Sequence, residues 1–116
     1  MSRRYQVVWS EFAERALAEV MEYFAATQPA NAVAVLKRIQ RQAAKLSRFP
    51  ERGRIVPELR AQGIGQYREL ILPPWRIIYR IAEDKVYVLA VVDSRRNIED
   101  VLLQTLTAGG DISLTS

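Results

Sequence analysis

The sequence contains neither cysteine nor histidine among its 116 residues. Without cysteine the chain can form no disulfide and no thiolate metal site, which fits a reducing cytoplasm. Without histidine it lacks the commonest metal ligand and the commonest proton-transfer group at neutral pH. We therefore expect a cytoplasmic protein without metal or cofactor, and any acid/base catalysis would have to use other side chains.

Long apolar runs are also missing. Residues 1–4 lead directly into a strand-like segment, with no apolar stretch of the kind that signal peptides carry. We expect no signal peptide and no membrane span. A hydrophobic content of 49% with 26% charged residues is typical of a globular protein, and 116 residues suffice for one domain. We predict a single domain over residues 1–108 and a loose tail over 109–116.

Acidic residues are scarce in the middle of the chain. The formal net charge is +4, and from Lys37 to Arg80 eleven Lys or Arg residues stand against three acids, Glu51, Glu58 and Glu69. This middle third is a candidate surface for a polyanion or for an acidic protein partner.

The first half of the chain has the pattern of a strand followed by two helices. Tyr5–Trp9 alternates aromatic residues and valine, as strands do. Ser10 is a suitable N-cap for a helix that ends near Ala26, and Pro29 suits the first turn of a second helix. The apolar stripe of the first helix, which we interpret as core, comprises Phe12, Ala13, Ala16, Leu17, Val20, Met21 and Phe24.

The second helix carries a basic ridge opposite its apolar face. Spacings of three and four residues place four side chains in one row, namely Arg38, Arg41, Lys45 and Arg48. The first helix carries four Glu and one Arg, so an antiparallel hairpin could pair the two helices, at about 0.2 to 1 kcal/mol for each exposed pair. The alternative interpretation is that the ridge binds a partner.

The segment Tyr67–Ile81 consists of two apolar runs separated by Pro73–Pro74. Because proline cannot donate a sheet hydrogen bond, we predict two antiparallel strands joined by a tight turn at this pair. Strand alternation divides the second run into two faces: Trp75, Ile77, Tyr79 and Ile81 on one, and Arg76, Ile78 and Arg80 on the other.

The first of these two strands carries Arg68, which could bring a third guanidinium close to Arg76 and Arg80. Whether it does so depends on the strand register, which the sequence leaves open. The arginines either form a binding surface or simply keep a half-exposed sheet face in solution.

The rest of the chain completes the order of elements. Residues 49–66 show no periodicity and form a connection that is unusually long for a compact domain. Val86–Val92 is typical of a strand in the middle of a sheet, and Asn97 resembles the cap of a short final helix. We predict an α+β domain of order β-α-α-β-β-β-α. Its mainly antiparallel four-stranded sheet would have the helical hairpin packed on one face and arginines on the other.

Short motifs follow one another along nearly all of residues 5–106. They comprise Leu46 with Phe49–Pro50, Gly53–Arg54, Pro57–Arg60, Tyr67–Glu69, Trp75–Arg80 and Arg95–Asn97. Each motif alone is weak, but in this order and spacing they resemble the RelE/ParE superfamily of bacterial toxins. The resemblance implies the toxin of a type II toxin-antitoxin pair, which a cognate antitoxin holds inactive by wrapping it with an extended or helical segment.

Two activities occur within that superfamily. ParE-like members inhibit DNA gyrase, whereas RelE-like members are ribosome-dependent endoribonucleases that cut messenger RNA. The long helical hairpin and the loop at Phe49–Arg54 resemble the ParE branch, so we prefer a gyrase inhibitor that arrests growth and serves plasmid stabilisation. A third hypothesis is a basic binding module without toxicity. The arginines that we expect to bind the target are Arg68, Arg76, Arg80, Arg95 and Arg96.

The ribonuclease alternative has specific chemical needs. Cleaving RNA through its 2′-hydroxyl requires a base, an acid and cations for the developing negative charge. The resemblance implies catalytic roles for Arg76, Arg80 and Asp93, the last of which stands where many relatives have histidine. Aspartate has an ordinary pKa of about 3.9 and is a poor general acid at neutral pH. Tyr79 and Tyr87 could replace it, but alternation turns Tyr79 away from Arg76, and we interpret it as core. The sequence thus assigns catalytic residues only under this alternative.

Overall fold

The computed structural model describes residues 4–94 and 96–107 of the chain. In order, the elements are β1 (Gln6–Trp9), α1 (Glu11–Thr27), α2 (Pro29–Ala44), the 3-10 turn η1 (Lys45–Ser47), β2 (Arg54–Ile55), α3 (Pro57–Arg60), β3 (Tyr67–Leu72), β4 (Trp75–Ala82), β5 (Lys85–Asp93) and α4 (Ile98–Thr107). The predicted α+β class is confirmed. The predicted tail, residues 109–116, and Arg95 lie outside the described residues. Among the described residues, no helix has the length and apolar character that a membrane span requires.

The sheet has five strands in the order β1-β5-β4-β3-β2. β1 runs parallel to β5, and the other three pairings are antiparallel. The prediction of four strands was therefore wrong in number, and the sheet is mixed, although mainly antiparallel. The additional strand β2 has only two residues, too few for alternation to show in the sequence.

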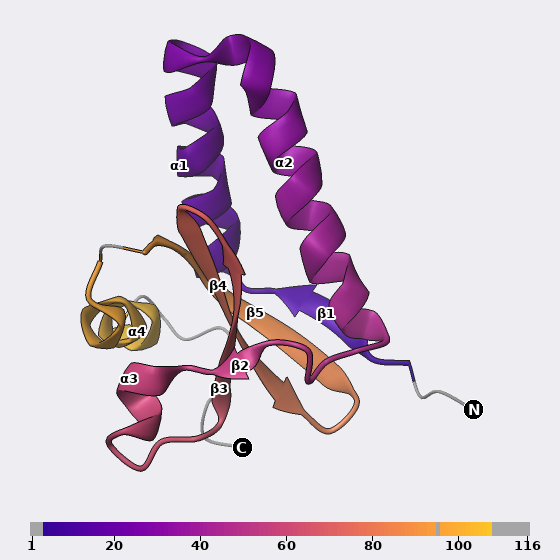
Figure 1. The fold of residues 1–116 in the computed structure, drawn as a ribbon, viewed down its shortest axis with the longest axis vertical. Coiled ribbons are helices and arrows are strands. Elements are labelled where there is room, and N and C mark those ends of the chain that lie inside the picture. Colours follow the sequence, from indigo (N-terminus) through magenta and orange to yellow (C-terminus); the bar gives the residue numbers. More distant parts are fainter. Residues whose placement is uncertain (1–3, 95, 108–116) are drawn as a thin grey trace.

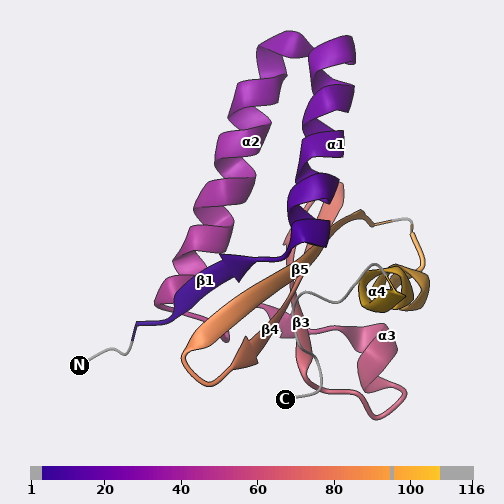
Figure 2. The same ribbon diagram turned by 180° about the vertical axis from the view of Figure 1, so that it is seen from behind.

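The helical hairpin is confirmed, and both helices start where the sequence predicts. The second helix is shorter than predicted, because α2 ends at Ala44 and the ridge residues Lys45 and Arg48 lie in and after η1. The Ser10 Oγ accepts a hydrogen bond from the Ala13 N–H at 2.9 Å, and it also donates to the Leu89 carbonyl of β5 at 3.3 Å. The N-cap thus fixes the start of α1 to β5, an interior strand of the sheet. Pro29 begins α2. Figures 1 and 2 show α1 and α2 side by side and extending well beyond the sheet.

Each face of the sheet carries an apolar core. The core under the hairpin includes Ile39, Leu46, Ile77 and Tyr79, so the predicted inner face of β4 is confirmed. The second core lies on the other face and comprises Val56, Leu59, Tyr67, Ile78, Leu89, Ala90, Val92, Ile98, Val101 and Leu102. Helices α3 and α4, which lie beside each other in both views, cover it (Figures 1 and 2). The expectation that arginines would occupy this face was incomplete, because the face is mostly apolar and covered.

The segment 49–66, which lacks any periodicity, is held close to the sheet. Gly53 lies so near β3 and β4 that a Cβ atom there would stand 2.5 Å from the Glu69 carbonyl oxygen and 2.6 Å from the Tyr79 hydroxyl. Val56 donates its backbone N–H to the Tyr67 carbonyl at 2.9 Å, which leads the chain from β2 into α3. The segment is therefore a part of the packed domain.

Candidate functional site

Arg76 lies at the centre of a cluster of four charged side chains. Its Nε donates to Glu69 Oε1 at 2.5 Å, and its Nη1 and Nη2 donate to the two carboxylate oxygens of Glu58 at 2.8 Å each. The second oxygen of Glu69 accepts from Arg54 Nε at 2.7 Å. The four residues come from β4, β3, α3 and β2. This ion cluster therefore fastens the 53–60 segment to the middle of the sheet.

The ion cluster is buried at its core and carries no net charge. The side chain of Glu69 is fully buried and that of Arg76 is 7% exposed, while Glu58 and Arg54 form the outer rim. The hydrogen bonds from Arg76 lower the pKa of Glu58 to about 2, and the two carboxylates raise the pKa of Arg76 above its usual range. Two carboxylates thus balance two guanidinium groups, which leaves no excess positive charge for a phosphate at this place.

Arg76 was predicted to contact the target or to serve as a catalytic cation, and the structure places it within the ion cluster. Three of its five N–H donors already serve carboxylates, and its side chain is nearly inaccessible. A ligand would have to compete with Glu58 and Glu69 for these donors. The position therefore gives Arg76 a role in holding the fold.

Arg68 does not join Arg76 on the sheet. The register pairs Arg68 with Tyr79, whereas Arg76 pairs with Ile71, so the two arginines lie on opposite faces. Arg68 instead donates through Nη1 to the Gly53 carbonyl at 2.7 Å. The strand neighbour that meets Arg76 is Glu69, an acid rather than a third cation.

Asp93 is also separated from Arg76. The register pairs Asp93 with Trp75, and Arg76 with Val92, so Asp93 lies on the opposite face of the sheet from Arg76. Arg80 is partly exposed between Tyr67 of β3 and Tyr87 of β5. The three residues that the ribonuclease alternative requires therefore do not converge on one site.

Tyr79 is fully buried, as the alternation of β4 predicts. Its hydroxyl donates to the Pro50 carbonyl at 2.6 Å and accepts from the Gly53 N–H at 3.0 Å. Burial raises the pKa of Tyr79 above its ordinary value. This residue thus holds the 50–53 segment in place and is unsuited to proton transfer with a bound RNA.

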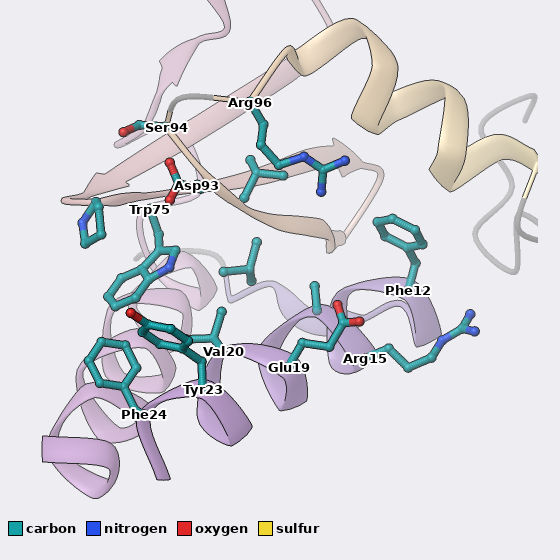
Figure 3. A pocket seen from close by; sticks show the side chains of 14 residues that line it. Phe12, Arg15, Glu19, Val20, Tyr23, Phe24, Trp75, Asp93, Ser94 and Arg96 are labelled. Carbon is teal, nitrogen blue, oxygen red and sulfur yellow. The ribbon is translucent and has the colours of Figure 1, made fainter. Parts of the chain in front are cut away.

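An open groove of about 1120 Å³ runs between α1 and the end of the sheet. Figure 3 shows α1 on one side and the ends of β4 and β5, with the chain towards α4, on the other. The lining residues include Phe12, Val20, Tyr23, Phe24, Trp75 and Val91 on its apolar surface. Charges of both signs, Arg15, Glu19, Asp93 and Arg96, stand around it.

The aromatic side chains of this groove form a short series. The rings of Tyr23 and Phe24, and those of Phe24 and Trp75, pack edge to face with centroids 5.6 Å apart in each pair. Tyr23 is nevertheless 63% exposed. An exposed aromatic residue beside a hollow of this size is a common feature of protein-binding sites.

The sequence did not reveal this groove. Its apolar stripe on α1 was interpreted entirely as core, but Ala13 is the buried residue of this helix and Phe12 and Val20 face the open groove. The feature of the sequence that could have indicated the groove is the width of the apolar stripe on α1. Apolar residues from Phe12 to Phe24 cover more of the helix circumference than one buried contact needs.

Comparisons with known proteins agree with the fold. The family described as the ParE toxin of the type II toxin-antitoxin system parDE matches residues 7–98. The toxin–antitoxin structure described as the chromosomal ParDE system from P. aeruginosa has a TM-score of 0.65 at 17% identity, covering 78% of this chain and 96% of that chain. The RelBE2 toxin-antitoxin complex from Mycobacterium tuberculosis has a TM-score of 0.54 at 22% identity, covering 78% and 92%.

None of the curated proteins compared matches the chain. The two structures, both below 25% identity, support the fold alone. The family match spans most of the chain, from β1 to the first residue of α4, and includes the ion cluster and all the residues that line the groove. The chain therefore belongs to the ParE toxin family of type II toxin-antitoxin systems, within the RelE/ParE superfamily.

Proposed function

We propose that this toxin inhibits DNA gyrase and does not cleave RNA. The observation that carries the proposal is the distribution of the candidate catalytic residues. Arg76 is neutralised by Glu58 and Glu69, and Asp93 lies on the opposite face of the sheet. A ribonuclease needs its acid, base and cations around one phosphate. A protein that acts by binding its target needs no such convergence.

A paired assay tests this proposal. Purified wild-type protein is added to gyrase with relaxed plasmid, and separately to ribosomes translating a defined messenger RNA. We expect loss of supercoiling or a trapped cleaved gyrase–DNA complex, and intact messenger. Relaxation of the same plasmid by a type I topoisomerase is the control for coating of the DNA, and it should continue.

Two variants separate the alternatives further. Asp93→Ala should keep its inhibition of gyrase, because no proton transfer depends on this carboxylate. Under the ribonuclease alternative, Asp93→Ala and Arg80→Ala would lose about 100-fold or more in cleavage rate. Ribosome-dependent cleavage by the wild type that disappears in either variant would overturn the gyrase proposal.

Arg68, Arg80 and Arg96 remain predicted contacts with the target. An alanine variant of each should be measured in the gyrase assay.

We also propose that a helical segment of the cognate antitoxin occupies the groove between α1 and the sheet. The similar structures are described as a ParDE system and a RelBE2 toxin-antitoxin complex, which supports an antitoxin partner. The groove offers an apolar surface bordered by Arg15, Glu19, Asp93 and Arg96. This combination suits an amphipathic helix, whose apolar residues enter the groove and whose polar residues meet the mixed charges.

Two exposed large apolar residues of the hairpin provide a matched test of that docking. Tyr23 lines the groove and is 63% exposed, whereas Val33 on α2 is 60% exposed and does not line it. Tyr23→Glu should weaken antitoxin binding at least about tenfold, since aromatic residues often dominate interfaces. Val33→Glu should leave the Kd nearly unchanged. Equal effects in the two variants would place the antitoxin elsewhere.

A further inference from the structure

The basic ridge, which runs along α2 and η1 to Arg48, has no acidic partner among the residues that the structure describes. Its four residues, Arg38, Arg41, Lys45 and Arg48, are all exposed, as are the flanking residues Lys37 and Arg52. None of these six side chains forms an ion pair within the part of the chain that the structure describes. The pairing with the acids of α1 that the sequence allowed is therefore absent, and the charge of the ridge is directed to solvent.

The ridge is also free of acids along its length. The sequence contains no Asp or Glu between Glu22 and Glu51. The opposite side of the same helix is buried through Ile39 and Ala43, so the basic side chains cannot turn inward. From Arg38 to Lys45 the helix rises about 10 Å, which is the length of roughly three base pairs along the axis of duplex DNA at about 3.4 Å each.

The composition of this surface favours nucleic acid over protein as its partner. A protein interface usually has apolar anchors at its centre, surrounded by polar residues. Here the exposed large apolar residues, Val33 and Phe49, stand at the two ends of the ridge and none stands within it. Arginine predominates in the ridge, and its planar fork matches phosphate oxygens.

We propose that the basic ridge binds the phosphate backbone of duplex DNA without reading its sequence. A single-stranded partner is less suitable, because such proteins usually stack successive bases on several aromatic rings. Phe49 is 63% exposed in a shallow hollow with Arg48 and Arg52, but it is the one exposed aromatic residue there among those described. No residue of α2 lines the groove, so the toxin can carry DNA and an antitoxin helix at the same time.

The test measures binding of the full-length protein to a labelled 24-base-pair duplex of random sequence by fluorescence anisotropy. The triple variant Arg38→Gln, Arg41→Gln, Lys45→Gln is compared with a control triple, Arg4→Gln, Arg60→Gln, Lys85→Gln, which removes equal charge at surface sites outside the ridge and the groove. The ridge triple should weaken binding at least about tenfold and reduce the salt slope by roughly 3, while the control triple changes binding much less. No gyrase is present, so this result is independent of the proposed target.

Three outcomes would overturn the proposal. The first is equal loss in both triples, which would mean that only net charge matters. The second is tighter binding to the matching single strand, with a loss on Phe49→Ala, which would assign the surface to unpaired bases. The third is displacement of the duplex by poly-glutamate as readily as by unlabelled duplex, which would indicate an acidic protein partner. Circular dichroism confirms that each variant is folded.

Discussion

Arginine is used in two opposite ways in this molecule. In the ion cluster, Arg76 is 7% exposed and surrounded by the carboxylates of Glu58 and Glu69. In the basic ridge, Arg38 and Arg41 are exposed and form no ion pair with any described residue. Burying a guanidinium requires neutralising acids and hydrogen-bond partners, and at the cluster each of the three nitrogens of Arg76 donates to a carboxylate. The environment of each arginine, rather than its presence, therefore indicates whether it holds the fold or meets a partner.

The sharpest test of this contrast is the removal of one arginine from each region. Arg76→Ala leaves Glu69 buried with Arg54 as its remaining charged partner, and breaking such a pair typically costs about 3 to 5 kcal/mol of stability. Arg38→Ala, on an exposed helix face, should change the free energy of unfolding by less than about 0.5 kcal/mol. Denaturant unfolding of both variants makes the comparison. Similar small values for the two would remove the structural role assigned to the ion cluster.

The close approach beside the ion cluster allows a second test. Gly53→Ala would place a methyl group 2.5 Å from the Glu69 backbone oxygen, so the 50–54 segment must move away from the sheet. We expect a cost of about 1 to 3 kcal/mol, as for other overpacked sites. Gly65, whose added Cβ would meet nothing within 4 Å, is the matched control. Replacing glycine with alanine by itself lowers the entropy of the unfolded chain and should not destabilise the protein at Gly65. A loss at Gly65→Ala as large as that at Gly53→Ala would therefore show that the close packing at Gly53 is not responsible.

Much of the fold could be predicted because its signals are local. Ser10, Pro29 and Asn97 begin helices, and Pro73–Pro74 separates two strands, as their backbone chemistry requires. The alternation along β4 also placed Tyr79 in the core correctly. These features depend on residues a few positions apart, which the sequence shows directly.

The candidate sites depend on contacts between distant residues. Glu58 meets Arg76 across 18 positions, and Arg54 meets Glu69 across 15. Which residue of β3 faces Arg76 is fixed by a register that a shift of one residue would reverse. Likewise, the parallel pairing of β1 with β5 joins two strands that are far apart in the sequence, and no local sequence pattern indicates it. The ion cluster and the groove therefore required the structure.

The ion cluster should make the stability of the fold depend on acid pH, whereas the ridge, which contains no acidic residue, should not. The pKa of Glu58 is lowered from 4.5 to about 2 in the folded protein, so its contribution is present above about pH 4.5 and is lost as the pH falls towards 2. Because the Glu58 side chain is 44% exposed, screening limits the expected loss to about 1 kcal/mol. Glu58→Gln should be less stable than wild type at neutral pH and should flatten this part of the stability profile. If the stability of Glu58→Gln falls with acid as steeply as that of the wild type, the acid sensitivity comes from other carboxylates.

The smallest expected effect is the change in antitoxin affinity when the ridge is altered, because the ridge and the groove are separate surfaces. The ridge triple Arg38→Gln, Arg41→Gln, Lys45→Gln leaves the groove intact, so its Kd for the antitoxin should stay within about threefold of wild type. Electrostatic steering by the basic surface acts mainly on the association rate, which we expect to fall in the variant and, in the wild type, with rising salt. Stopped-flow measurement at low and physiological salt separates association from dissociation. A dissociation rate that rises tenfold or more in the ridge triple would mean that the antitoxin contacts α2 directly, and the ridge would then belong to the antitoxin interface instead of standing free for DNA.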